Sequence, residues 1–534
     1  MNKQIRKLAA GLLVLYLALF AALNVIQVSK RDELNAAPQN NRQTIRDFNR
    51  IRGSIVTADG VVVARSVPVP DPDSNFNFQR EYPEGMLFSN VTGYYTYSFG
   101  STQLEKTQND VLMGDTTQQK VDSVFGGADN TGSVQLTMRK DVQAVAAQAI
   151  DSFNAAQKAN GSVDEVQGSV VVMDVRTGEV LAMVSLPRFD ANQIADHDTK
   201  AAEDVLDFLN NYPGKPLLAN AYQENYMPGS AFKVVTTGIA MENGVTNMER
   251  TWANETEFVP PQTDDPIQNY GGSSCGGTMA EVFFRSCNIP FAQMAIELGP
   301  QRMTDGVRSW GIGEKLPIDL PGAVASSFCS NVLPCDAAFF EDQLPLLAIG
   351  GFGQGNDLMV PLHMCMVAAT IANGGRMMTP HVVAATLKKD GTVISRTPTD
   401  QVWKQPISAA TAATLTELMV GVVNNGTGKA MQLANGIQAA AKTGTAQLNF
   451  VEGEPQRSHA WIIGFAPAEA PRYAVSVVIK GTTDEISAGT GGGLPGRLPS
   501  RCSTTCSLRG CDVNALPSTR SVSSVGDFSQ KAVQ

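Results

Sequence analysis

Ser230 and Lys233 stand three residues apart in the segment Met-Pro-Gly-Ser-Ala-Phe-Lys-Val-Val, and this pair could perform nucleophilic chemistry. A serine hydroxyl is a weak nucleophile until a base removes its proton. Positions i and i+3 of a helix lie on one face, so the Lys233 amine is expected to reach the Ser230 hydroxyl. Pro228 and Gly229 favour a turn that opens a helix, which would place Ser230 at a helix N-terminus that stabilises negative charge. By itself the Ser-x-x-Lys spacing is a weak signal, because it also occurs by chance on exposed helices.

Two further motifs follow in a fixed order. Residues 286–288 read Ser-Cys-Asn and begin 56 residues after Ser230, and residues 442–445 read Lys-Thr-Gly-Thr. Three ordered motifs are much more specific than any one of them. The set resembles the active-site motifs of penicillin-binding proteins and serine β-lactamases. This resemblance implies acyl transfer through a covalent ester on Ser230, and β-lactams would acylate the same serine as mimics of D-alanyl-D-alanine.

The resemblance also assigns roles to the side chains around the serine. Lys233 is the expected base, which requires an amine that is neutral near pH 7; burial, the nearby cation Lys442 and the helix dipole would all lower its pKa. The alternative for Lys233 is a solvated helix lysine, and the identity of the base is disputed in this superfamily. Ser286 and Asn288 are expected on the opposite wall, where the hydroxyl passes a proton to the leaving amine and the amide holds Lys233. Asn288 could instead, or in addition, cap a helix that begins near Ile289.

The third motif is expected on a strand at the edge of the active site. An acyl-peptide substrate could add alongside it as an extra strand, and Gly444 would let the backbone approach closely. Lys442 and the hydroxyls of Thr443 and Thr445 would attract a terminal carboxylate. By resemblance, the backbone N–H groups of Ser230 and Thr445 form the oxyanion hole. The alternative is an ordinary edge strand with a bulge at the glycine.

Composition argues against several other functions. The chain has 534 residues, of which 43% are hydrophobic and 17% charged, as is typical of a folded protein of two or three domains. The net charge of −10, without a tract of Lys and Arg, argues against nucleic-acid binding. Its four histidines are far apart, so neither a metal site nor a cofactor is expected. The glycine-rich segments 349–355 and 426–430 lack the spacing and flanks of nucleotide-binding loops.

The N-terminus carries one hydrophobic segment, from Leu8 to Val28. About 21 residues suffice for one crossing of the bilayer, and the segment is longer than the core of a cleaved signal, so we predict an uncleaved transmembrane helix. Basic residues lie on both sides of it, so the positive-inside rule does not decide the orientation. The short tail 1–7 and the family resemblance favour a single-pass protein of the plasma membrane, with the bulk of the chain extracytoplasmic.

Two domains are expected after the membrane segment. Residues 29–155 resemble, through the segments 52–65, 93–95 and 100–105, the mainly β pedestal (dimerisation-like) domain of class B penicillin-binding proteins, in the form seen in the actinobacterial penicillin-binding protein A group. The first of these segments reads as two short strands around an Asp-Gly turn. An alanine-rich helix is then expected to run to about Phe153.

Residues 156–494 are predicted to form a transpeptidase domain of the penicillin-binding and serine β-lactamase type. We expect a mixed α/β fold of the α+β type, with a five-stranded antiparallel sheet between helices. The sheet would join an early hairpin to a late meander, namely residues 169–174 and 180–184 to residues 437–446, 459–465 and 473–479. The alternative, two separate sheets, would leave long hydrophobic edges uncovered.

Two features of the chain stay open. The eight cysteines of an exported protein could form disulfides, and Cys329 and Cys335 are close enough to pair around a short loop, although spacing alone does not establish the pairing. Cys287 is interpreted as a small buried side chain rather than a nucleophile. Residues 495–534 depart from the family pattern and are either a disordered natural tail or the product of an altered reading frame; the abrupt break favours the second.

The resemblance implies a class B penicillin-binding protein, a monofunctional peptidoglycan D,D-transpeptidase that cross-links stem peptides. The predicted anchor and pedestal argue against a free β-lactamase, and there is no room for a glycosyltransferase domain. A glycan polymerase of the SEDS type is the implied membrane partner. Septation and elongation both remain open, with septation favoured by the penicillin-binding protein A resemblance. The alternatives are a catalytically impaired scaffold protein, and a D,D-carboxypeptidase or β-lactam sensor.

Overall fold

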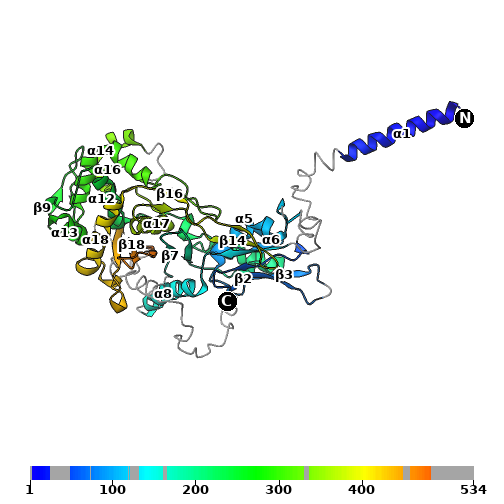
Figure 1. Ribbon diagram of the computed structural model, residues 1–534, viewed down its shortest axis with the longest axis horizontal. Coiled ribbons are helices and arrows are strands. Elements are labelled where there is room, and N and C mark those ends of the chain that lie inside the picture. The colour runs from blue at the N-terminus through cyan, green and yellow to red at the C-terminus, as the bar shows by residue number, and fades with distance from the viewer. Residues whose placement is uncertain are drawn as a thin grey trace.

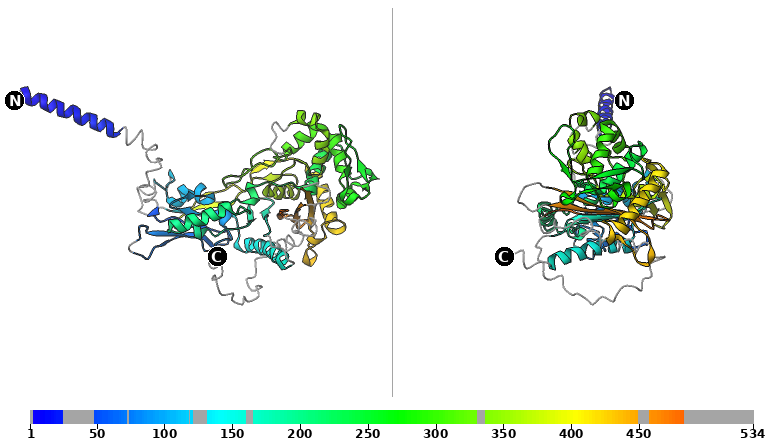
Figure 2. Two further views of the ribbon diagram at one scale, coloured as in Figure 1. Left: turned by 180° about the vertical axis from the view of Figure 1, so that it is seen from behind. Right: turned by 90° about the vertical axis from the view of Figure 1, so that its left-hand side faces the viewer.

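The computed structural model describes residues 3–24, 48–71, 74–117, 119–120, 131–159, 165–329, 336–448 and 457–482. The body is elongated, with helices α12 to α16 gathered at one end and strands β2 and β3 at the other (Figure 1, Figure 2). Helix α1 (Lys3–Asn24) stands apart from the body and buries none of its residues. It is the one helix within the described ranges that is long and apolar enough to cross a membrane. The rest of the predicted segment, residues 25–28, lies outside the described residues.

A five-stranded antiparallel sheet forms the centre of the larger part of the body. Its strand order is β17-β18-β19-β7-β8, so the early hairpin pairs with the late meander through β7 and β19. This arrangement confirms the predicted single sheet. The strands are β7 (Gly168–Asp174), β8 (Val180–Leu186), β17 (Ala440–Gln447), β18 (Ser458–Ala466) and β19 (Tyr473–Ile479).

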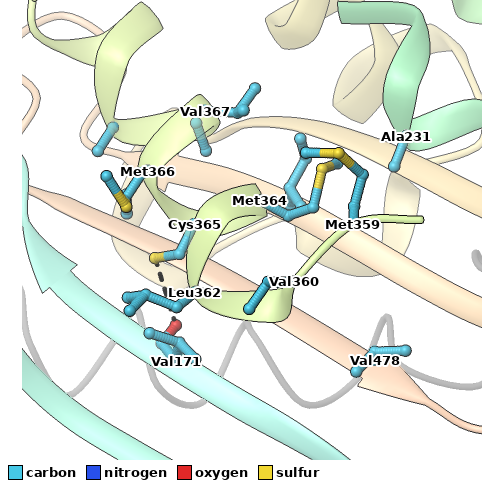
Figure 3. Packing of buried hydrophobic residues seen from close by; sticks show 14 of the residues in the cluster. Val171, Ala231, Met359, Val360, Leu362, Met364, Cys365, Met366, Val367 and Val478 are labelled. Atoms are coloured by element: carbon cyan, nitrogen blue, oxygen red, sulfur yellow. Dashed lines mark hydrogen bonds between the residues drawn. The ribbon is translucent and has the colours of Figure 1, made fainter. Parts of the chain in front are cut away.

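Helices cover both faces of this sheet because successive side chains of each strand point to opposite faces. On one face, Val171 and Met173 belong to the core that contains α17 (Pro361–Ala372). Figure 3 shows this packing, in which the Cys365 thiol donates a hydrogen bond to the Val171 carbonyl at 3.6 Å. On the other face, Val170 and Val172 pack with α8 (Lys140–Ala159). Helix α8 extends six residues beyond the predicted end at Phe153.

The remaining helices of this part flank the sheet or extend from it. They are α9 (Ala191–Ile194), α10 (Thr199–Asn211), α11 (Asn220–Gln223), η2 (Gly229–Phe232), α12 (Lys233–Glu242), η3 (Tyr270–Gly272), α13 (Met279–Phe284), α14 (Ile289–Ser309), α15 (Ala337–Glu341), α16 (Leu344–Gly350), α18 (Ala409–Asn425), η4 (Lys429–Met431) and η5 (Ala434–Gly436). Helix α14 is interrupted at Gly299, whose φ of 73° is non-helical and precedes Pro300. Small two-stranded sheets pair β9 (Thr251–Glu255) with β12 (Cys275–Thr278), β10 (Glu257–Phe258) with β11 (Ile267–Gln268), and β13 (Met377–Met378) with β16 (Val402–Lys404).

The pedestal is built around a six-stranded sheet of order β15-β14-β6-β1-β2-β3. Four of its strands come from the N-terminal segment: β1 (Ile55–Val56), β2 (Val62–Pro68), β3 (Phe78–Glu81) and β6 (Gly132–Leu136). The two outer strands on one side, β14 (Val383–Lys388) and β15 (Val393–Arg396), come from the chain after α17. The pedestal sheet is therefore completed by a segment that is more than 200 residues away in the sequence. The short elements α4 (Ser89–Thr92), β4 (Tyr95–Thr96), β5 (Gly100–Ser101), α5 (Gln103–Thr107) and α6 (Asn109–Met113) complete this part.

A buried ionic cluster links β3 and the segment before β1 to α5. The carboxylate of Glu105 accepts hydrogen bonds from Arg52 Nε at 2.6 Å and from Arg80 Nε at 2.7 Å. Burial acts to raise the pKa of Glu105, but the two guanidinium groups outweigh it and the pKa lies below its usual value. Removing the Glu105 carboxylate would leave two buried guanidinium groups without their counter-charge, which makes this residue a structural requirement of the pedestal.

Candidate active site

Ser230 lies in the 3₁₀ turn η2, and Lys233 is the first residue of α12. The serine is therefore at the N-terminal end of a helix, as expected. Its hydroxyl, however, forms no hydrogen bond with any residue that the structure describes, so the predicted direct contact with Lys233 is not made in this conformation. The physical reason is that the amine of Lys233 is held by acceptors on another loop.

Lys233 joins the first motif to the second. Its Nζ donates to the backbone oxygen of Ser286 at 2.7 Å and to Oδ1 of Asn288 at 2.9 Å, and lies 3.4 Å from Ser286 Oγ. The residue is fully buried, so it is not the solvated helix lysine of the alternative interpretation. The rings of Phe291 and Phe352 lie 5.1 and 5.9 Å from the amine and surround it with apolar surface.

Lys442 joins the third motif to the second. Its Nζ donates to Ser286 Oγ at 2.8 Å and to the Thr443 carbonyl at 2.9 Å, and the residue is fully buried. Ser286 therefore stands between the two lysines. Its φ of +60° is unusual for a residue other than glycine, and this backbone conformation presents both its carbonyl and its hydroxyl to the lysines.

Both amines lie in surroundings that favour their neutral forms. Burial, and then the charge of Lys442, lower the pKa of Lys233 well below its ordinary value. Burial lowers the pKa of Lys442 to about 7. The shift of the Lys233 pKa is in the direction that a general base requires, as expected from the sequence.

Asn288 holds Lys233 rather than capping a helix. Its side chain makes no capping hydrogen bond, and its Nδ2 donates instead to the Gln268 carbonyl at 3.0 Å. Backbone N–H groups at the N-terminus of α14 find their acceptor in Asn269 instead. The Oδ1 atom of Asn269 accepts hydrogen bonds from the backbone N–H groups of Asn288 at 2.8 Å and Ile289 at 3.2 Å. The side-chain cap suggested for Asn288 is therefore wrong. Asn269 was missed because a cap that comes from another segment leaves no signal in local spacing.

A disulfide braces the second motif. Cys287 is bonded to Cys275 on β12, with the two Cα atoms 5.7 Å apart. Cys287 is buried, as predicted, and its sulfur is held in the disulfide. Cys329 is also disulfide-bonded, while Cys335, its suggested partner, lies outside the described residues.

Strand β17 packs directly against the turn that carries Ser230. A Cβ atom on Gly444 would fall 2.5 Å from the Pro228 carbonyl oxygen and 2.9 Å from the Ala231 nitrogen, so only glycine fits there. The hydroxyl of Thr443 lies 2.6 Å from that of Thr427, which belongs to the glycine-rich segment 426–430. Of the four motif residues on β17, Thr445 alone is only partly buried.

The structure thus brings all three motifs to one place, while no residues suited to holding a metal ion are found among the described ones. Comparison with known proteins agrees with the family resemblance that the three motifs indicate. Residues 168–494 match the penicillin binding protein transpeptidase domain, and residues 52–134 match the penicillin binding protein A dimerisation domain. The peptidoglycan D,D-transpeptidase PbpA of Mycolicibacterium smegmatis is 35% identical over 506 residues, which cover 92% of this chain and 96% of that protein.

Solved structures agree with the sequence relatives. The penicillin G acyl-enzyme complex of penicillin-binding protein A from M. tuberculosis has a TM-score of 0.74 and 31% identity, over 85% of this chain and 98% of that one. The D,D-transpeptidase domain of a peptidoglycan glycosyltransferase from Eggerthella lenta has a TM-score of 0.70 and 28% identity, over 85% of this chain and 97% of that one. The fold is that of a penicillin-recognising transpeptidase. The chain belongs to the penicillin-binding protein transpeptidase family.

Proposed function

We propose that this protein is a peptidoglycan D,D-transpeptidase in which Ser230 attacks a stem-peptide carbonyl and expels the terminal D-alanine. A second stem-peptide amine then attacks the ester and completes the cross-link. The observation that carries the proposal is the hydrogen-bonded set of Lys233, Ser286, Asn288 and Lys442 beside the turn of Ser230. The two mycobacterial relatives named peptidoglycan D,D-transpeptidase PbpA support it.

Lys233 is the proposed base. A neutral amine has two N–H donors and one lone pair, and its two short contacts, to Ser286 O and Asn288 Oδ1, use both donors. The lone pair is then available to the Ser230 proton once substrate brings the two side chains together. Catalytic hydrogen bonds are often long or absent without substrate and form in the complex, so the open Ser230 hydroxyl is compatible with this role.

Ser286 is the proposed proton carrier from Lys233 to the leaving amine of the substrate. Its hydroxyl contacts both lysines, at 2.8 Å from Lys442 Nζ and 3.4 Å from Lys233 Nζ. A proton that Lys233 takes from Ser230 can therefore pass through Ser286 toward the leaving amine. Lys442, whose pKa burial lowers to about 7, supplies positive charge in its protonated form. Because its amine is fully buried, the hydroxyls of Thr443 and Thr445 are the groups proposed to meet the substrate carboxylate.

The backbone N–H groups of Ser230 and Thr445 are the proposed oxyanion hole. The close packing of Gly444 against Pro228 and Ala231 supports this role, because it holds the two backbones side by side. Removal of one such donor typically costs about 10²–10³-fold in rate. The substrate strand is proposed to add alongside β17.

The remaining assignments concern location, partner and chain organisation. Helix α1 fits a single-pass membrane anchor, and we place the rest of the chain outside the cytoplasm because the Cys275–Cys287 disulfide is expected only in an oxidising compartment. Residues 29–155 are proposed as the pedestal, 156–494 as the catalytic domain and 495–534 as an atypical tail. A SEDS-type glycan polymerase is the proposed membrane partner, in septation or elongation.

Labelling with penicillin tests the proposal. Full-length protein in detergent is treated with penicillin, and the modified peptide is mapped by mass spectrometry. The expected result is one adduct, on Ser230, which Ser230→Ala abolishes and the surface control Ser309→Ala retains. Absence of an adduct on the wild-type protein would instead support the scaffold alternative.

The product of the reaction separates the two catalytic alternatives. The enzyme is incubated with a D-alanyl-D-alanine peptide, with and without an acceptor amine. A transpeptidase forms the cross-linked product when the acceptor is present. Fast release of D-alanine without any cross-linked product would support the carboxypeptidase alternative and contradict the proposal.

A further inference from the structure

The segment between α16 and α17 lies against both backbones of the proposed oxyanion hole. This segment includes Phe352, Gly353 and Gln354, which belong to the glycine-rich stretch 349–355 that lacks the flanks of a nucleotide-binding loop. The backbone N–H of Gly229, next to Ser230, donates to the Gly353 carbonyl at 2.8 Å. Gly353 thus contacts the turn that carries Ser230, and the following residue, Gln354, contacts β17.

Gly353 fixes the peptide plane that carries the Ser230 N–H group. A Cβ atom on Gly353 would lie 2.1 Å from the Gly229 carbonyl oxygen, so the two backbones are in direct contact. The Gly229 carbonyl and the Ser230 N–H belong to one planar peptide unit. A contact that restrains the carbonyl therefore also restrains the direction of the N–H. Gly353 has a φ of +77°, which together with the close approach requires glycine here.

Gln354 holds the other backbone. Its Nε2 donates to the Thr445 carbonyl oxygen at 3.2 Å. That oxygen faces the turn of Ser230, because a Cβ atom on Gly229 would fall 2.3 Å from it. In a strand the N–H and C=O groups of one residue point to the same side, as their exchange with a single partner residue requires. The Thr445 N–H is therefore directed to the same side as the carbonyl that Gln354 holds.

We propose that Gln354 is a positioning residue for the oxyanion hole, which it aligns through its hydrogen bond to the Thr445 carbonyl. This inference rests on the proposed function, since it concerns the alignment of the proposed Ser230 and Thr445 donors. An oxyanion donor must lie about 2.7–3.1 Å from the developing charge, so a small rotation of the strand at Thr445 weakens catalysis. Gly353 and Gln354 together brace both donors from adjacent positions of one loop, and Gln354 itself touches no reacting atom.

The Gln354→Met variant tests the proposal, because it keeps the volume of the side chain and removes the donor. Acylation by penicillin is followed at increasing concentrations, which separates the binding constant from the rate constant of the chemical step. The expected result is a fall of about tenfold in the chemical step, smaller than the loss of a direct donor, with a binding constant unchanged within about twofold. Gln79→Met is the matched control, since Gln79 donates to the Ala195 carbonyl at 2.7 Å far from the site.

A second variant makes the test independent of folding defects. In Gln354→Glu, an ionised carboxylate can only accept, whereas a protonated carboxyl can again donate to the Thr445 carbonyl. The acylation rate of this variant relative to wild type should therefore rise about fivefold or more as the pH falls from 7 to 5. The melting temperature, measured in parallel, identifies any change caused by unfolding.

The possible failures can be told apart. A chemical step in Gln354→Met within twofold of wild type, or a rate ratio for Gln354→Glu that is independent of pH, would overturn the positioning role. In both cases wild-type protein still forms its adduct on Ser230. If wild-type protein forms no adduct on Ser230, the proposed function itself is wrong and the positioning role falls with it.

Discussion

The charge of Lys442 is expected to set the pH range in which Lys233 acts as a base. Both Nζ atoms contact Ser286 Oγ, at 2.8 and 3.4 Å, so they are at most about 6.2 Å apart. Below about pH 7, the pKa to which burial lowers Lys442, that amine is protonated. At an effective dielectric constant of about 20, two unit charges at this distance repel by about 2.7 kcal/mol, which disfavours protonation of Lys233. Burial is the larger cause and lowers the pKa of Lys233 in the same direction.

The Lys442→Met variant removes the charge and retains an apolar side chain of similar length. Without the repulsion the pKa of Lys233 rises, so the amine becomes neutral only at higher pH. The acid limb of the acylation rate, measured at saturating penicillin between pH 5 and 10, should therefore move to higher pH. The loss of Lys442 also weakens carboxylate binding, so the midpoint of the limb is the quantity to compare rather than the rate.

Two further measurements make the prediction decisive. Lys404→Met is the control, because Lys404 pairs with Glu314 at 2.6 Å outside the site and its profile should match wild type. If acylation of Lys442→Met is too slow to follow, the Lys233 amine can be titrated by NMR of labelled lysine side chains. A midpoint, or a lysine titration, that is the same in Lys442→Met and wild type would refute the coupling of the two amines.

Three other predictions follow from the same site and its surroundings. Gly444→Ala would place a methyl group 2.5 Å from the Pro228 carbonyl oxygen and separate β17 from the serine turn, so the acylation rate should fall about 10²-fold; a rate within threefold of wild type would contradict this packing argument. Asp357 is buried without a hydrogen-bond partner among the described residues, and burial raises its pKa. The folded state therefore keeps a proton that the unfolded state releases above about pH 4. As a result, the contribution of Asp357 to wild-type stability falls as the pH rises. Asp357→Asn should remove this loss, which is seen as a smaller drop in melting temperature between pH 5 and 8, and an equal drop in both proteins would show that Asp357 does not titrate in this way. Replacing both Cys275 and Cys287 by alanine opens a loop whose ends are 12 positions apart and should cost about 3 kcal/mol in the free energy of unfolding, measured with denaturant; no loss would mean that the disulfide does not restrain the unfolded chain.

Periodicity and motif order were sufficient for the sheet and for the list of candidate site residues. The strands of the early hairpin and late meander have strong β-forming composition, and their pairing into one sheet is the arrangement that leaves fewest hydrophobic edges exposed. The β17 prediction differed most: the strand begins at Ala440 rather than Ile437. The reason is that a boundary depends on where the pairing with β18 starts, and that pairing is non-local.

Features that depend on distant segments were not predictable. The pedestal sheet takes β14 and β15 from the chain after α17, and no local pattern distinguishes those strands from a separate hairpin. The helix cap supplied by Asn269 and the disulfide partner of Cys287 have the same origin. The cap and the disulfide both form only when folding brings two distant segments side by side.

The sequence by itself determined which side chains could perform the chemistry, because Ser230, Lys233 and Lys442 are defined by residue type and order along the chain. Only the tertiary structure decided how they are connected. Folding directs the Lys233 amine to Ser286 and Asn288 rather than to Ser230, and it buries two lysines around one hydroxyl. Hydrogen-bond partners and pKa values are properties of a three-dimensional environment, since they depend on distance and on exclusion of water, and neither quantity is encoded in spacing along the chain.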